Sequence, residues 1–282
     1  MKALALVLLA PLLVACGGGA AGTDGGPTIV TSFYPLQYVA ERIAGDHATI
    51  ETLTQPGQEP HDLELSIQAV GEISDADLVV YEKGFQSAVD EAVETADPAR
   101  VVDSSEGHDV EADPHVWLSP ANMTETARQV ESELADLDPD NAAEYSANLE
   151  AFEADMDALL EEYDAGLADC AISTVVVGHD AFRNLPVRDV TWAPISGLSP
   201  DAQPSPARLQ EIRNLVESAG VTTIFSEELV SPEVAESLAT DLGIEAAVLD
   251  PIEGLTDETA DEDYVSLMRK NLAALRKAND CT

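Results

Sequence analysis

Residues 173–182, Ser-Thr-Val-Val-Val-Gly-His-Asp-Ala-Phe, decide the fold class of this chain. The run 173–177 is very apolar and β-branched, which predicts a strand. His179 follows directly after that strand. In open α/β sheets, ligands bind beyond the carboxyl ends of the strands, so this histidine is a candidate ligand.

Predicted strands and helices alternate along the chain on both sides of this segment. The second half has predicted strands at 173–177, 190–195, 222–226 and 245–249, with helices near 206–218, 232–241 and 261–278. The first half has predicted strands at 28–33, 49–53, 78–81 and 100–103, with helices near 36–43, 66–73 and 85–95. Alternating strands and helices predict an α/β fold with parallel sheets, here in two similar halves.

A long helix is predicted between the halves, over residues 139–168. Its apolar residues recur at spacings of three and four: Ala142, Tyr145, Leu149, Phe152, Met156, Leu159 and Tyr163. At 1.5 Å per residue this helix is about 45 Å long, enough to run along both lobes. The stripe fits equally a helix that packs on one lobe only. The expected domains are an N-terminal lobe at 28–138, this helix, and a C-terminal lobe at 169–282.

The start of the chain predicts export. Residues 1–15 contain a short apolar run, too short to span a bilayer but typical of a secretory signal peptide. The small residues before Cys16 resemble the lipobox of bacterial lipoproteins, in which the cysteine receives a lipid. An ordinary signal peptide with an incidental cysteine is the alternative. Residues 16–27 then form a flexible tether, and the protein is expected outside the cytoplasm, anchored to the cell membrane.

Two cysteines remain for the folded body, Cys170 and Cys281. An exported protein meets oxidising conditions, and the wide separation of the two residues does not suit a metal knuckle. A disulfide is therefore expected.

The composition excludes one class of partner. The 282 residues include 13 Lys and Arg against 54 Asp and Glu, a formal net charge of −41. Such a field repels phosphate backbones, so nucleic acid is excluded. The acidity attracts cations but is not by itself evidence of a metal site.

Five histidines are present, and three of them lie in loops past predicted strands: His61, His115 and His179. The other two fit a site less well, because His47 is expected on an exposed turn and His108 in a short acidic loop. Singly, each histidine is more often a packing or capping residue than a ligand. Their common placement in one fold predicts a shared site.

A fourth ligand is expected from a carboxylate. Asp250 directly follows the predicted strand at 245–249, and Glu227 at the end of 222–226 is the alternative. Three imidazoles with one carboxylate suit tetrahedral Zn²⁺, whereas Mn²⁺ favours more carboxylate oxygen. The sequence contains no HExxH, GxSxG or phosphate-loop motif, and four ligands leave no open position for catalysis, as expected of a carrier rather than an enzyme.

At the level of motifs, the chain resembles the zinc/manganese class of solute-binding proteins of ATP-binding-cassette importers, most closely the zinc-uptake branch. The matching segments span nearly all of 28–282: TSFYPLQYVAERIAGD, PGQEPHDLELS, ISDADLVVY, DPHVWLSPANM, GHDAF, ISGLSPDAQPSP and VLDPIEG. The resemblance implies two α/β lobes joined by one long helix, with the metal in the cleft between them. It also implies that the ligands are His61, His115, His179 and Asp250, and that Cys170 pairs with Cys281.

Three segments depart from the pattern of this class. The loop that is often long and rich in histidine is only SEGHDVEAD, Gln203 stands where Glu is common, and KGFQSAVDEAVE differs after the third strand. The expected function is zinc binding and delivery to a membrane permease by a monomer. The alternatives are a manganese-binding member and a surface adhesin in which the metal is structural.

Overall fold

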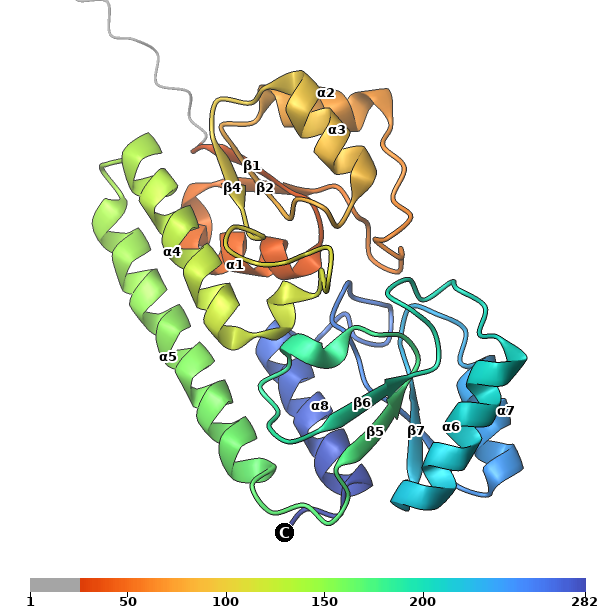
Figure 1. Cartoon of the computed structure of the whole chain (residues 1–282). Coiled ribbons are helices and arrows are strands. Elements are labelled where there is room, and N and C mark those ends of the chain that lie inside the picture. The colour runs from red at the N-terminus through yellow and green to blue at the C-terminus, as the bar shows by residue number, and fades with distance from the viewer. Residues whose placement is uncertain (1–25) are drawn as a thin grey trace, which may run out of the picture.

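The computed structural model describes residues 26–282, and they form two lobes that each contain a parallel four-stranded sheet (Figure 1). The predicted signal peptide and most of the tether, including Cys16, lie outside the described residues and stay predictions. The expected fold class, two parallel α/β lobes, is confirmed.

The N-terminal lobe orders its strands β2-β1-β3-β4. These strands are β1 (Thr28–Thr31), β2 (Thr49–Thr52), β3 (Leu78–Tyr81) and β4 (Val101–Asp103). Its helices are α1 (Tyr34–Ala44), α2 (Ile67–Asp75) and α3 (Ser87–Ala96), with a 3-10 turn η1 (Gly45–His47) after α1. The central strand β3 is buried at every residue because helices cover both faces of a parallel sheet.

The C-terminal lobe repeats this order as β6-β5-β7-β8. Its strands are β5 (Thr174–Val177), β6 (Thr191–Pro194), β7 (Thr223–Ser226) and β8 (Glu245–Val248). Its helices are α6 (Pro206–Ala219), α7 (Glu233–Leu242) and α8 (Tyr264–Ala278), with a 3-10 turn η3 (Phe182–Asn184) after β5. In both lobes the strand order reverses between the two inner strands. These are β1 and β3 in the N-terminal lobe, and β5 and β7 in the C-terminal lobe.

Helices α4 (Pro120–Leu137) and α5 (Ala142–Gly166) lie side by side along one edge of the molecule (Figure 1). Tyr145, Phe152, Met156, Leu159 and Tyr163 on α5 are fully buried. The helix packs on α1 of the first lobe and α8 of the second. It therefore runs along both lobes rather than one.

Helix α4 was not anticipated from the sequence. Ser119 accepts a hydrogen bond from the backbone N–H of Asn122 as the N-cap, and Pro120 occupies the first turn. Both features are start signals of a helix, and both are present in the sequence. The buried residues Met123, Ala127, Val130 and Leu134 give the face that packs on α5 and α1.

The expected disulfide is present between Cys170, just after α5, and Cys281 near the end of the chain. It closes a covalent loop around the whole C-terminal lobe. Within residues 26–282, no helix combines the length and the apolar character that crossing a bilayer needs.

Candidate metal centre

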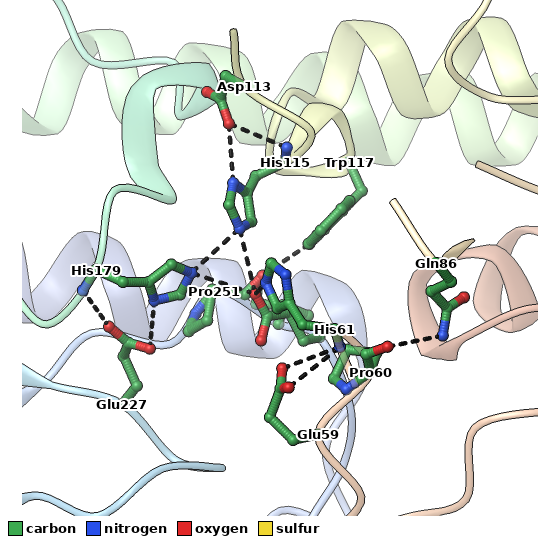
Figure 2. A network of polar contacts seen from close by, with 12 residues as sticks. Glu59, Pro60, His61, Gln86, Asp113, His115, Trp117, His179, Glu227 and Pro251 are labelled. Carbon is green, nitrogen blue, oxygen red and sulfur yellow. Dashed lines mark hydrogen bonds and ion pairs between the residues drawn. The ribbon is translucent and has the colours of Figure 1, made fainter. Parts of the chain in front are cut away.

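Three histidines and one glutamate converge between the two lobes (Figure 2). His61 lies in the loop after β2, and His115 directly precedes the 3-10 turn η2 (Val116–Leu118) after β4. His179 lies two residues after β5, and Glu253 lies in the loop between β8 and α8. All four loops leave the carboxyl ends of parallel strands, where open α/β sheets bind ligands. Each lobe supplies two of the four groups.

Four of the six distances between the donor atoms are close to those of a tetrahedral metal shell. Glu253 Oε1 lies 3.4, 3.5 and 3.6 Å from the Nε2 atoms of His61, His115 and His179. The Nε2 atoms of His115 and His179 are 3.1 Å apart, and all four donor atoms lie within 4.8 Å of one another. Zinc–nitrogen bonds of about 2.05 Å at tetrahedral angles place neighbouring ligand atoms about 3.3 Å apart. The group thus fits a Zn²⁺ ion at its centre.

The four side chains are almost completely withdrawn from solvent. Those of His115 and His179 are 0% exposed, that of Glu253 is 2% exposed, and that of His61 is 12% exposed. Among the described residues, neither His61 Nε2 nor Glu253 Oε1 makes a hydrogen bond. Buried polar atoms are normally paired, so two unpaired atoms that face each other at 3.4 Å indicate the place of a cation.

Two carboxylates outside the converging group orient two of the imidazoles. His115 Nδ1 lies 2.8 Å from Asp113 Oδ1, and His179 Nδ1 lies 2.6 Å from Glu227 Oε2. With the proton on Nδ1, each ring presents a free Nε2 lone pair to the centre, and the carboxylate makes that nitrogen more basic. Glu227 Oε1 also accepts from the backbone N–H of His179 at 2.8 Å, which fixes the residue at both ends.

The electrostatics favour positive charge at the centre. Burial opposes the charge on His179, but its hydrogen bond to Glu227 and its contact with Glu253 outweigh that effect and raise the pKa of His179 to about 10. The pKa of His115 is raised in the same way, against burial, by its contacts with Asp113 and Glu253. Burial alone would raise the pKa of Glu253, yet its close contacts with the three histidines hold that pKa well below its usual range. These shifts describe a cavity built to stabilise a cation.

Contacts between the lobes tie the metal-bearing loops together. Trp117 Nε1 donates to the carbonyl of Pro251 at 2.7 Å, and Tyr264 donates from its hydroxyl to the carbonyl of Trp117 at 2.7 Å. Asn184 of the second lobe donates to Asp113 at 2.8 Å. The loop that carries Glu253 is therefore held against the segment that carries His115.

Comparison with known proteins agrees with this geometry. The family model of the periplasmic zinc-uptake complex component A, ZnuA, matches residues 29–278. The chain belongs to the ZnuA family. The expected resemblance to the zinc-uptake branch is thereby confirmed.

Individual members of the ZnuA family and related structures are similar over most of the chain. The zinc-binding lipoprotein AdcA of Streptococcus pneumoniae is 35% identical over 99% of this chain, which spans 62% of the length of AdcA. The Zn(II)-bound ZnuA-like domain of that AdcA is 35% identical with a TM-score of 0.80, covering 91% of this chain and 100% of the domain. The laminin-binding protein Lbp of Streptococcus pyogenes is 30% identical with a TM-score of 0.80, covering 90% and 100%.

The structure places the fourth group differently from the expectation for this ZnuA-family chain. Asp250 is buried, and its Oδ1 accepts a hydrogen bond from the backbone N–H of Ile252 at 2.8 Å. The residue is not part of the converging group. Ile252 has a φ of 58°, a left-handed conformation that is strained for a β-branched residue. This turn carries the chain past Asp250 and brings Glu253 to the three histidines. The carboxylate that lies in the converging group is therefore that of Glu253, and Asp250 lies outside the group.

The other candidates have different surroundings. Glu227, the alternative fourth ligand, contacts Nδ1 of His179 rather than the centre. His47 is the last residue of η1, where its Nε2 lies 2.9 Å from Glu144 Oε2 on α5, and His108 is exposed. Glu253 follows Asp250 by three residues in the quoted motif VLDPIEG, so the sequence contained it without indicating which of the two acids faces the site.

Proposed function

We propose that this chain is an extracytoplasmic zinc-binding protein that delivers Zn²⁺ to the permease of an ATP-binding-cassette importer. One observation carries the proposal: three imidazole nitrogens lie 3.4 to 3.6 Å from one carboxylate oxygen in a buried centre, and all four atoms lie within 4.8 Å of one another. We assign the ligands as His61, His115, His179 and Glu253. The family membership and the zinc-binding relatives support the same cargo.

Zinc is favoured over manganese by the donor set. Three neutral nitrogen donors and a single carboxylate suit zinc, whereas Mn²⁺ lies lowest in the Irving–Williams order and prefers oxygen. A group with four protein ligands leaves no open coordination position for a reacting water, which suits transport rather than hydrolysis. The two-lobe arrangement adds a route for release, because separating the lobes divides the ligands two and two.

The surrounding assignments complete the proposal. Cys16 receives the lipid that anchors the protein to the outer side of the cell membrane, residues 16–27 act as the tether, and the protein acts as a monomer. One acyl chain gives only marginal anchoring, so Cys16 carries two or three. Membrane fractionation tests this, and a Cys16→Ala variant that stays with the membranes contradicts it.

The decisive test of cargo is metal analysis of the protein purified without added metal, followed by competition titration with a zinc chelator. We expect one tightly bound zinc per chain and much weaker Mn²⁺ binding. Glu253→Gln should weaken zinc binding strongly, while Asp250→Asn should have a small effect because its amide oxygen can still accept from Ile252. Manganese bound as tightly as zinc, or the reverse order of the two variants, contradicts the proposal.

A second candidate function is adhesion, because the similar structure Lbp is described as a laminin-binding protein. The zinc site is common to both functions, so zinc binding does not separate them. Direct binding to immobilised laminin, with and without zinc, does. Neighbouring genes for an ATPase and a permease would favour transport.

A further inference from the structure

The side chain of Gln86 lies behind the loop that carries His61 and is 2% exposed. Its Nε2 donates to the carbonyl of Pro60 at 3.1 Å (Figure 2). The same nitrogen donates to the hydroxyl of Thr54 at 3.0 Å. The hydroxyl of Thr54 in turn donates to the carbonyl of Ser32 at 2.8 Å. A chain of hydrogen bonds therefore connects the residue before His61 to the end of β1.

Only the donor end of the Gln86 amide is used. Its Oε1 is buried and has no hydrogen-bond partner within residues 26–282. An unpaired buried oxygen costs stability, so the role of this side chain lies in its nitrogen. The position requires a donor that faces two acceptors, the carbonyl of Pro60 and the hydroxyl of Thr54.

His61 needs such support more than the other ligands do. The rings of His115 and His179 are each held at Nδ1 by a carboxylate, whereas no such bond is formed by His61 among the described residues. Its backbone N–H donates to Glu59 at 3.1 Å, and its ring packs edge-on against Phe85 with centroids 4.7 Å apart. Phe85 and Gln86 are neighbours in the turn after β3, so one turn supports both the ring and the backbone of this loop.

We propose that Gln86 is a positioning residue that holds His61 at the metal centre through Pro60. The proposal rests on the assignment of His61 as a zinc ligand. Because His61 is the one partly exposed member of the group, the turn after β3 controls the ligand nearest to solvent. This gives a role to the KGFQ segment, which departs from the pattern of the family.

The first test replaces Gln86 with Leu, which removes the donor and keeps a similar volume. We expect zinc affinity, measured by chelator competition at neutral pH, to fall about tenfold or more, as for other residues that orient metal ligands. Gln86→Glu should lose affinity similarly, because a carboxylate cannot donate to Pro60 and Thr54. Asn148→Leu is the matched control: Asn148 also donates its side-chain amide to a carbonyl, that of Ile43 at 3.0 Å, outside the metal site. Its zinc affinity should not change.

A double-mutant cycle separates positioning from general destabilisation. In a His61→Ala background, Gln86→Leu should cause no further loss of zinc affinity, since the ligand on which it acts is absent. Bound Co²⁺ gives a second readout, because the strong visible absorption of the four-coordinate ion should weaken in Gln86→Leu. An equal loss in both backgrounds, or an unchanged Co²⁺ spectrum, overturns the inference.

The zinc affinity of His61→Ala alone distinguishes a failure of the ligand assignment from a failure of the role proposed for Gln86. If that variant binds zinc normally, the ligand assignment fails. If it binds zinc weakly while Gln86→Leu binds normally, the assignment stands and only the role of Gln86 fails.

Discussion

The two lobes share a topology but use the point where the strand order reverses in different ways. In the C-terminal lobe, His179 lies two residues after β5 and Glu227 one residue after β7, and their side chains are 2.6 Å apart. The equivalent places in the N-terminal lobe hold Phe33 after β1 and Glu82 after β3. His179 belongs to the converging group and Glu227 contacts its ring, whereas Phe33 and Glu82 are not part of that group.

A glycine explains part of this difference. A Cβ at Gly178, between β5 and His179, would lie 2.3 Å from Glu227 Oε1, so the glycine gives Glu227 room to reach His179. The N-terminal lobe has Ser32 at this place. There Glu82 contacts the hydroxyl of Ser104 at 3.4 Å, and its Oε1 has no partner within residues 26–282.

The N-terminal lobe instead fills its reversal point with aromatic rings. Phe33 packs against Phe85 and Trp117 with centroids 4.9 and 4.7 Å apart, and these rings back His61 and His115. Its two ligands therefore come from the loops after the outer strands β2 and β4. Topology determines where a ligand can lie, and local side chains determine whether one does.

The C-terminal lobe also contains a disulfide, and its removal should have the largest effect on the free energy of unfolding. The disulfide Cys170–Cys281 spans 111 residues of the C-terminal lobe. Loss of a bridge over a loop of this length should lower the free energy of unfolding by about 4 to 5 kcal/mol, because the unfolded chain gains entropy. Urea unfolding of a Cys170→Ser, Cys281→Ser double variant measures it, with reduced wild type as the control. An unchanged unfolding midpoint would refute the prediction.

Replacing His179 with Phe, the residue at the equivalent place in the N-terminal lobe, should remove one of the proposed ligands. His179→Phe should weaken zinc binding about a hundredfold, or about 3 kcal/mol, if four ligands share a binding free energy of about 10 to 16 kcal/mol. The matched control is His108→Phe, because His108 is exposed and outside the group. Competition titration compares the two. Equal affinities would remove His179 from the site.

Replacing Gly178 with Ser, the residue at the equivalent place in the N-terminal lobe, should disturb the contact between Glu227 and His179. In Gly178→Ser the new Cβ displaces Glu227, so we expect zinc affinity to fall about 10- to 100-fold, as for other residues that orient metal ligands. Glu227→Gln tests the same contact without the steric change and should give a loss of similar size. A tight-binding Gly178→Ser variant would show that Glu227 does not orient His179.

The smallest effect on zinc is expected for Glu82→Gln, which should leave the affinity unchanged. Burial, added to the nearby carboxylates Asp103, Asp113 and Asp90, holds the pKa of Glu82 well above its usual value, although Ser104 opposes this. The folded state then binds the proton more tightly than the unfolded state, so stability falls as pH rises above the unfolded pKa of about 4.5. Glu82→Gln should remove that fall. Thermal unfolding from acid to neutral pH measures it, and an identical pH dependence in both proteins would contradict it.

Much of the architecture could be predicted from local patterns. Most of the eight strands are short β-branched or apolar runs, such as 173–177, and packing within the two sheets buries the inner strands β1, β3, β5 and β7. The face of α5 could be predicted from spacings of three and four. Helix α4 could have been predicted from Ser119 and Pro120, which are start signals of a helix.

The candidate site was predictable only in part. His179 lies close to the end of a strand, and His61 and His115 lie in loops that follow strands, which are positions that the sequence indicates. The choice of Glu253 over Asp250 depends on the left-handed backbone of Ile252 and on a hydrogen bond inside the turn. The support from Gln86 depends on contacts between loops far apart in the sequence. Neither is visible in composition or spacing.

The central claim is that His61, His115, His179 and Glu253 hold one zinc ion between the lobes. It is tested most directly by a crystal structure of the zinc-loaded protein with anomalous scattering measured at the zinc edge. We expect one peak between the lobes, about 2.0 to 2.2 Å from the three Nε2 atoms and from a carboxylate oxygen of Glu253. A peak bound by Asp250 or Glu227 in place of Glu253, or no peak between the lobes, would contradict it.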